Sequence, residues 1–267
     1  MSSGRVVLVG AGPGDPELIT LCGLRWLRRA EVVVYDRLVT PSLLEEAPGT
    51  ALLIPAGKSA TRHCLEQSAI NALLIHHARR GRLVVRLKGG DSFVFGRGGE
   101  EALACADAGI PVEVVPGVSS AVSVPAAAGI PVTHRGLASS FAVVTGHEDP
   151  AKSAGAVDWP RLATSVDTLV IVMGVASLPA IARRLIAAGR SAQTPVAVVS
   201  RGTTPSQESV TGTLGDIAAR AAHLSAPAII VVGDVVDLAG RLPAHRPGVE
   251  QAVSPVGATT SHRERIA

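Results

Sequence analysis

A glycine-rich turn lies in the stretch "LVGAGPGDPELIT", residues 8–20. A β-branched run precedes the turn and a helix-like pattern follows it, which is the setting in which G-x-G-x-x-G binds the pyrophosphate of a dinucleotide. Gly10 and Gly12 fit that motif, but Asp15 stands where its third glycine belongs. Pro13 also removes a backbone N–H where a pyrophosphate needs donors. The turn therefore matches a dinucleotide site only in part.

An aspartate follows the next strand-like run, because "VVVY" at residues 32–35 leads directly into Asp36. A dinucleotide site places an acidic residue roughly 20 residues beyond its glycines, where it binds a ribose hydroxyl. A carboxylate at the carboxyl end of a strand is equally suited to accept a proton from a substrate. The spacing alone leaves both interpretations open.

A second glycine-rich loop lies in "VVRLKGGDSFVFGRGGEE", residues 84–101. Gly89, Gly90 and Asp91 follow a predicted strand directly, and open α/β sheets bind ligands at this end of their strands. Adjacent glycines let a backbone approach a ligand closely. Phe93 and Phe95, two of only 3 phenylalanines, flank the loop. The alternative is that the phenylalanines belong to the core and that the glycines only turn the chain.

Strand-like apolar runs alternate with helical patterns along most of the chain. The candidate strands are Val6–Val9, Val32–Tyr35, Leu83–Leu87, Val112–Val115, Phe141–Val144, Leu169–Val172, Val196–Val199 and Ala228–Val232. Asp15 and Pro16 can begin one helix, and residues 66–80 form another that Gly81 can end. The alternation predicts α/β architecture, with mostly parallel sheets covered by helices.

The segment between Pro116 and Arg135 is rich in proline and glycine and is the best place for a boundary between two α/β halves. Periodicity stops beyond Leu242. We therefore expect an N-terminal domain over residues 1–117, a C-terminal domain over residues 118–242 and a mobile tail over residues 243–267.

Composition excludes several classes of protein. Of the 267 residues, 47% are hydrophobic and 18% charged, which is typical of a globular protein. The net charge of +3 is too small to indicate nucleic-acid binding. No secretory signal opens the chain, and prolines and glycines interrupt the long uncharged stretch at residues 114–133. Because Cys22, Cys64 and Cys105 form no C-x-x-C, we expect a cytoplasmic protein with neither a zinc site nor disulfides.

Several long motifs occur in one order and together resemble the tetrapyrrole methylase family, in particular those members that methylate uroporphyrinogen III. The motifs are "VLVGAGPGDPELITLCGLRWLRRAEVVVYDRLV", "RLKGGDSFVFGRGGEE", "VVPGVSSA", "GIPVTHRG" and "VTGH". The resemblance covers about Val6 to Gly240. It implies two α/β domains with S-adenosyl-L-methionine in the cleft between them, usually in a homodimer. The implied reaction is C-methylation of uroporphyrinogen III at two ring carbons, through precorrin-1 to precorrin-2, for sirohaem and cobalamin biosynthesis.

The resemblance also assigns site residues. Asp36 matches the family's proton acceptor, and Lys58 matches its proton donor. The positions that match cofactor contacts are Pro13, Gly89, Gly90, Asp91, Val94, Ser119, Ser120, Met173 and Gly202. S-adenosyl-L-homocysteine would remain when the cofactor has transferred its methyl group. No metal is implied, because a methyl group on a sulfonium is already activated and the protein has mainly to position the reactants.

The implied substrate carries many carboxylates, which gives a role to basic residues in or beside the predicted loops. These residues are Arg37, Arg62, His63, Arg97, His134 and Arg135. Arginine forks suit carboxylates, although any one of these residues could equally be a solvated surface charge. Family sequences commonly read G-K-R-x-G-x-H where this chain has residues 57–63, "GKSATRH", and Ser92 stands where proline is common. The alternatives are a methylase of a later corrin precursor, a ribosomal RNA methylase and an NAD-dependent oxidoreductase.

Overall fold

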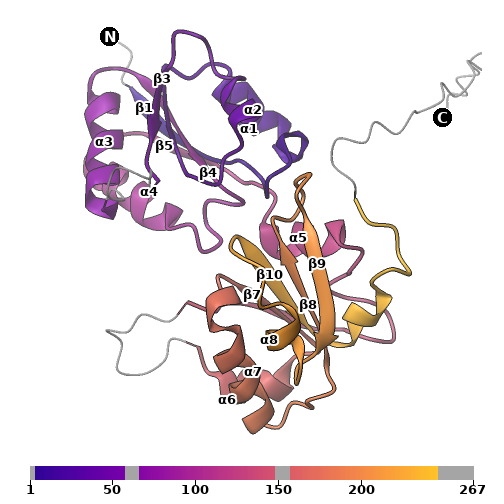
Figure 1. Cartoon of the computed structure of the whole chain (residues 1–267). Helices are drawn as coiled ribbons and strands as arrows, with labels where there is room; N and C mark the ends of the chain where they lie inside the picture. Colours follow the sequence, from indigo (N-terminus) through magenta and orange to yellow (C-terminus); the bar gives the residue numbers. More distant parts are fainter. Residues whose placement is uncertain (1–3, 58–65, 148–156, 246–267) are drawn as a thin grey trace, which may run out of the picture.

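Two five-stranded sheets, each covered by helices on both faces, lie one above the other in Figure 1. The computed structural model describes residues 4–57, 66–147 and 157–245. The chain completes the first sheet at Val115 and enters the second half at Ser120. No helix of these residues is long and apolar enough to cross a membrane.

The first sheet has the strand order β3-β2-β4-β1-β5, and all of its strands are parallel. Its strands are β1 (Arg5–Gly10), β2 (Val32–Tyr35), β3 (Leu52–Pro55), β4 (Leu83–Lys88) and β5 (Val112–Val115). Val6 and Leu8 point to the core under helices α3 (Gln67–Arg79) and α4 (Gly98–Asp107). Val7 and Val9 point to the opposite core, under α1 (Leu21–Leu27) and α2 (Pro41–Leu44). Both faces are thus buried, which explains the continuous apolar runs.

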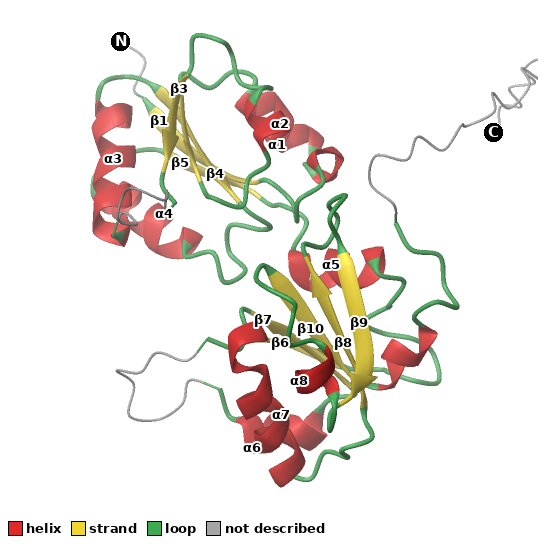
Figure 2. Cartoon of the chain, viewed as in Figure 1, coloured by secondary structure: helices red, strands yellow, loops and turns green. Residues whose placement is uncertain are grey.

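The second sheet has the strand order β6-β7-β10-β8-β9 and mixed directions. Its strands are β6 (Phe141–Thr145), β7 (Thr168–Val172), β8 (Pro195–Ser200), β9 (Glu208–Thr213) and β10 (Ala228–Val232). Only β6 and β7 pair in parallel; β10 is antiparallel to β7 and β8, and β8 is antiparallel to β9. Helices α6 (Trp159–Ser165), α7 (Leu178–Ala187) and α8 (Ile217–Arg220) cover one face, and α5 (Ser120–Ala127) and η3 (Asp234–Leu238) cover the other (Figure 2).

The predicted α/β class is confirmed, and each predicted strand is present. Strands β3 and β9 were not predicted. Both are edge strands with largely exposed side chains; β9 has no apolar run, and the run of β3, "LLIP", is short and ends in proline. The second sheet also differs from the parallel pairing that simple alternation suggests. Only a short loop joins β8 to β9, and such a loop allows antiparallel pairing without a crossover helix.

Two helices were predicted with their ends, and the structure confirms the later one but divides the earlier one. Helix α3 spans Gln67–Arg79, and Gly81 follows it with a φ of +80°. Asp15 caps only a 3-10 turn, η1 (Pro16–Leu18), because Thr20 then caps α1 as a separate helix. Most of the predicted tail, residues 246–267, lies outside the described residues. Its first part includes His245, whose backbone N–H donates to the carbonyl oxygen of Ala127 at 3.0 Å.

Three loops meet at the carboxyl ends of the neighbouring strands β4, β1 and β5. A Cβ built on Gly117 would lie 2.3 Å from the carbonyl oxygen of Gly90 and 2.6 Å from the Cα of Gly10. These distances are shorter than any normal contact, so backbone packs on backbone here. The loops can lie this close because neither Gly10 nor Gly117 has a side chain.

We predict that Gly117→Ala lowers the free energy of unfolding by about 1–3 kcal/mol, because the added methyl group must push backbone apart. Urea unfolding measures the change. The matched control is Gly99→Ala in helix α4, where an added Cβ would meet nothing within 4 Å. That control should be neutral or stabilising by about 0.5–1 kcal/mol. Equal stability of the two variants would contradict the close packing.

Candidate active site

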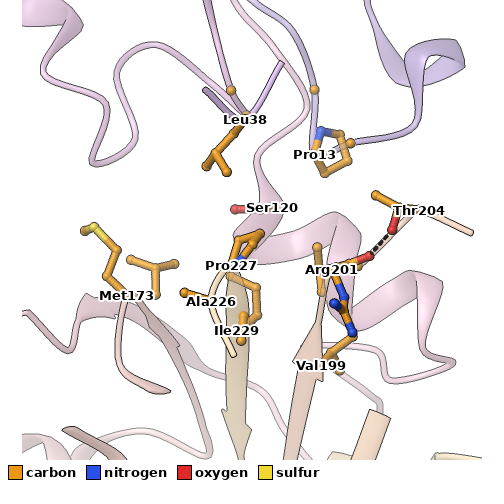
Figure 3. Close-up of a pocket in the computed structure, with 18 of the residues that line it drawn as sticks. Pro13, Leu38, Ser120, Met173, Val199, Arg201, Thr204, Ala226, Pro227 and Ile229 are labelled. Carbon is orange, nitrogen blue, oxygen red and sulfur yellow. Dashed lines mark hydrogen bonds between the residues drawn. The ribbon is translucent and has the colours of Figure 1, made fainter. Parts of the chain in front are cut away.

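A cavity of about 580 Å³ lies between the two sheets. Its volume is within the range of about 300–1,000 Å³ that is usual for small-molecule sites. Pro13 and Leu38 from the first half face Met173, Pro227 and Thr204 from the second half across it (Figure 3). The loops that follow parallel strands form one wall, as expected for ligand sites in α/β sheets.

The wall from the first half consists of loops at the ends of β1, β2 and β4. Its residues are Gly12, Pro13, Gly14, Arg37, Leu38, Thr40, Gly89 and Gly90. The N–H of Gly90 donates to the carbonyl oxygen of Gly12 at 2.7 Å, and the N–H of Gly12 donates to the carbonyl oxygen of Gly90 at 3.2 Å. The two glycine-rich motifs that stand out in the sequence are therefore joined in one wall.

The wall from the second half comes from α5, from the loops after β7 and β8, and from the start of β10. Its residues are Ser120, Val124, Val172, Met173, Val175, Val199, Arg201, Gly202, Thr204, Ser206, Ala226, Pro227, Ala228 and Ile229. Met173 and Arg201 have left-handed backbones, with φ of +55° and +48°. This conformation costs about 1–3 kcal/mol per non-glycine residue and is typical of functional sites.

Contacts at Asp15 connect the first wall to the rest of the chain. The N–H of Asp15 donates to Oγ1 of the buried Thr203 at 3.2 Å. The Oδ1 atom accepts from the N–H of Glu17 at 2.9 Å, and Oδ2 lies 2.9 Å from Nε2 of His245. The turn after β1 is thus held by both the β8–β9 loop and the C-terminal segment.

The predicted cofactor residues divide into two groups. Pro13, Gly89, Gly90, Ser120, Met173 and Gly202 line the cavity. Asp91, Val94 and Ser119 are not among the lining residues. Asp91 instead accepts two backbone N–H groups, from Phe93 through Oδ1 and from Gly117 through Oδ2, each at 2.8 Å. Ser119 caps α5 by accepting from the N–H of Ala121 at 3.3 Å. Asp91 and Ser119 therefore shape the loops, and their neighbours line the cavity.

Asp36 directly follows β2, one residue before the cavity-lining Arg37, and its side chain is 33% exposed. Nη2 of Arg86 lies 2.5 Å from its Oδ1, and Nζ of Lys88 lies 3.9 Å from its Oδ2. Burial lowers the pKa of Lys88 and the neighbouring Arg86 lowers it further, whereas the carboxylates of Asp36 and Glu101 oppose the shift. Buried cations therefore hold Asp36 at the end of β2, next to the cavity-lining Arg37.

Of the predicted substrate-binding residues that the structure describes, one lines the cavity and the others lie outside its lining. Arg37 lines the cavity. Arg97 begins α4 with a left-handed φ of +59° and donates to both carboxylate oxygens of Glu100, at 2.9 and 2.7 Å. The hydrogen bond from Arg97 holds the pKa of Glu100 below its ordinary value. His134 and Arg135 are exposed in the turn before β6. Lys58, Arg62 and His63 lie outside the described residues.

Sequence reasoning missed much of the second wall. It selected Gly202 but not the neighbouring Arg201, Thr204 and Ser206, nor residues 226–229. The polar run "SRGTTPS" directly after an apolar strand is a signal that could have identified the first three. Residues 226–229 carry no such signal, because they read as an ordinary turn and strand start.

The model of the tetrapyrrole (corrin/porphyrin) methylases matches residues 5–218. The chain therefore belongs to this family. It is 51% identical over 239 residues to the uroporphyrinogen-III C-methyltransferase of Methanocaldococcus jannaschii. The matched residues cover 88% of this chain and 98% of that protein. It is 49% identical to siroheme synthase 2 of Aeromonas hydrophila, over 90% of this chain but 50% of that protein.

Solved structures also include relatives with this fold. The structure of the uroporphyrin-III C-methyl transferase from Thermus thermophilus, complexed with S-adenyl homocysteine, superposes with a TM-score of 0.76 and 45% identity. That match covers 88% of this chain and 100% of the other. The architecture of two α/β halves is thus that of the family.

We predict that Thr203→Val lowers the free energy of unfolding by about 1–3 kcal/mol, because it leaves the buried N–H of Asp15 without its acceptor while preserving side-chain shape. Guanidinium unfolding measures the loss. Thr211→Val, at an exposed position of β9, is the matched control and should change little. The bond between the two halves contributes nothing if both variants unfold at the same denaturant concentration.

Proposed function

We propose that the chain catalyses the S-adenosyl-L-methionine-dependent C-methylation of uroporphyrinogen III at two ring carbons. The product is precorrin-2, formed through precorrin-1, in sirohaem or cobalamin biosynthesis. The observation that carries the proposal is the cavity between the two halves, whose first wall is built from the two glycine-rich motifs that carry the family resemblance. Identity of 51% with a named uroporphyrinogen-III C-methyltransferase over 98% of that protein supports the choice of substrate.

The residues of the cavity fit the cofactor. A Cβ on Gly90, whose φ is +66°, would meet only the Ser120 nitrogen, at 3.8 Å, so open space borders this backbone. Apolar side chains such as Leu38 and Ile229 suit a nucleoside, while the Ser120 hydroxyl and backbone groups of the glycine loops can orient its polar atoms. When bound, S-adenosyl-L-methionine supplies a methyl group already activated on a sulfonium. The residues that would hold the cofactor are Pro13, Gly89, Gly90, Ser120, Met173 and Gly202.

The chain's own residues have three tasks in this proposal. The two walls exclude water and hold the donor and the ring carbon in line, which alone accelerates a transfer greatly. The carboxylate of Asp36 accepts the proton that leaves the ring after methylation. Lys58, outside the described residues, is the proposed proton donor.

Basic residues would bind the substrate's carboxylates. Arg37 is the strongest candidate because it lines the cavity beside Asp36. Arg97, His134 and Arg135 are also proposed, together with Arg62 and His63 from the undescribed segment. Arg201, on the opposite wall, adds a further guanidinium that the sequence did not indicate.

The proposal has further parts. The division into domains 1–117 and 118–242, with residues 243–267 as a tail, and the place of action in the cytoplasm rest on sequence patterns, and the homodimer rests on the family resemblance. No metal takes part, because transfer from a sulfonium needs no Lewis acid. Neither nucleic acid nor membrane is a partner.

The proposal is tested by incubating the protein with uroporphyrinogen III and methyl-labelled S-adenosyl-L-methionine. We expect mass spectrometry to find a tetrapyrrole that carries two labelled methyl groups. Absence of label from the tetrapyrrole would overturn the proposed substrate. Calorimetry with S-adenosyl-L-homocysteine and with NAD tests the cofactor, because tight binding of NAD alone would favour an oxidoreductase.

We predict that Asp36→Asn slows methyl transfer by about a hundredfold, because the amide cannot accept the proton. Calorimetric affinity for S-adenosyl-L-homocysteine should stay within about threefold, since Asp36 does not line the cavity. Asp107→Asn, at an exposed position at the end of α4, should leave both values unchanged. Normal turnover by the Asp36 variant would show that another group takes the proton.

A further inference from the structure

Three charged side chains are almost completely buried beneath Asp36. Arg86 and Lys88 on β4 are each 2% exposed, and Glu101 on α4 is 0% exposed. Charged groups are almost never buried to this degree unless they are paired, because removing them from water costs several kcal/mol per ion. The mechanism proposed above does not use these three residues.

The hydrogen bonds form a chain that leads from Glu101 to Asp36. Oε1 of Glu101 accepts from Nε of Arg86 at 3.1 Å, from Nζ of Lys88 at 3.0 Å and from Nε2 of Gln67 at 3.2 Å. The other end of the same guanidinium reaches Asp36, whose Oδ1 lies 2.5 Å from Nη2. Arg86 is therefore held in one orientation by the carboxylates on its two sides.

The two oxygens of Asp36 have different surroundings. Oδ1 accepts the short bond from Arg86, whereas Oδ2 accepts no hydrogen bond from any residue in the described part of the chain. Nζ of Lys88 lies 3.9 Å from Oδ2, which is too long for a hydrogen bond. Oδ2 is thus the oxygen that remains available to a substrate.

The charges of this cluster balance when Asp36 is ionised. Arg86 and Lys88 carry two positive charges, and Asp36 and Glu101 carry two negative charges. Nearby, Arg97 and Glu100 at the start of α4 pair with each other and add no net charge. The carboxylate of Asp36 therefore belongs to a cluster whose two positive and two negative charges compensate one another.

We propose that Arg86 and Glu101 are positioning residues for the methyl transfer, with Arg86 holding Oδ1 of Asp36 so that Oδ2 accepts the proton, and with Glu101 holding Arg86. This inference rests on the proposed function. In the step, a C–H bond of the methylated, cationic macrocycle breaks and its electron pair neutralises the ring. The proton forms an O–H bond at Oδ2 and is then released to water.

The experiment uses a double variant, Arg86→Met with Glu101→Gln, which removes one charge of each sign and so avoids an uncompensated buried ion. Glu46→Gln is the matched control, because Glu46 pairs with Arg28 at 2.8 Å in an exposed ion pair. The conservative variant Arg86→Lys keeps the positive charge but loses the planar fork. Thermal unfolding verifies that each variant is folded.

We expect kcat of the double variant to fall by about 10- to 100-fold, while KM and the affinity for S-adenosyl-L-homocysteine change by less than about threefold. Arg86→Lys should recover only part of kcat, because a lysine can donate to Oδ1 of Asp36 but lacks the planar fork that also reaches Glu101. A folded double variant with kcat within twofold of wild type overturns the proposal.

A second measurement does not depend on turnover. The carboxyl ¹³C resonance of Asp36, assigned by its loss in Asp36→Asn, is sensitive to the hydrogen bonds of this side chain. We expect the resonance to shift in the double variant, which lacks the donor to Oδ1, and to stay the same in Glu46→Gln. An unchanged resonance would refute the role of Arg86 even if uroporphyrinogen III is methylated normally. A shifted resonance in a protein that does not methylate uroporphyrinogen III would instead overturn only the proposed function.

Discussion

The site depends on backbone contact among loops at the ends of three neighbouring strands. Because β4, β1 and β5 are adjacent in the first sheet, the loops that follow them emerge side by side. Gly12 and Gly90 exchange hydrogen bonds, and Asp91 connects the loop after β4 to the N–H of Gly117. This wall of the cavity is therefore mostly main chain, which keeps its position because its hydrogen bonds are satisfied internally.

The opposite wall has a different physical basis. Two of its residues, Met173 and Arg201, adopt the left-handed backbone conformation, which an isolated chain would avoid. They persist where the surrounding structure fixes them, and the fully buried strands β7 and β8 that precede them provide this support. The cavity thus combines a hydrogen-bonded wall with a strained one, and its shape requires both halves of the chain.

Local patterns predicted most of the architecture, because buried parallel strands produce apolar runs that are easy to recognise. They failed at β9, which has no such run, and at β3, whose short apolar run ends in proline and lies exposed at a sheet edge. In the site, Gly90 could be predicted from a glycine-rich turn at a strand end, whereas Pro13 and Gly202 were predicted only from the family resemblance. The contacts of Arg201 and Ile229 could not, since they depend on how a second, mixed sheet lies against the first. The Arg86 network was equally hidden, because an arginine within an apolar strand does not reveal its partners 15 and 50 residues away.

Asp15, which stands where a dinucleotide-binding motif has its third glycine, has a structural role in the turn after β1. In a dinucleotide site that glycine allows a helix to pack closely on its strand. Here Asp15 caps a single 3-10 turn, accepts a contact from His245 and donates its N–H to Thr203. The side chain that breaks the fingerprint therefore ties the first glycine loop to the other half of the molecule. A glycine at this position would keep only the backbone bond to Thr203, and the turn after β1 would lose its carboxylate contacts with η1 and the C-terminal segment.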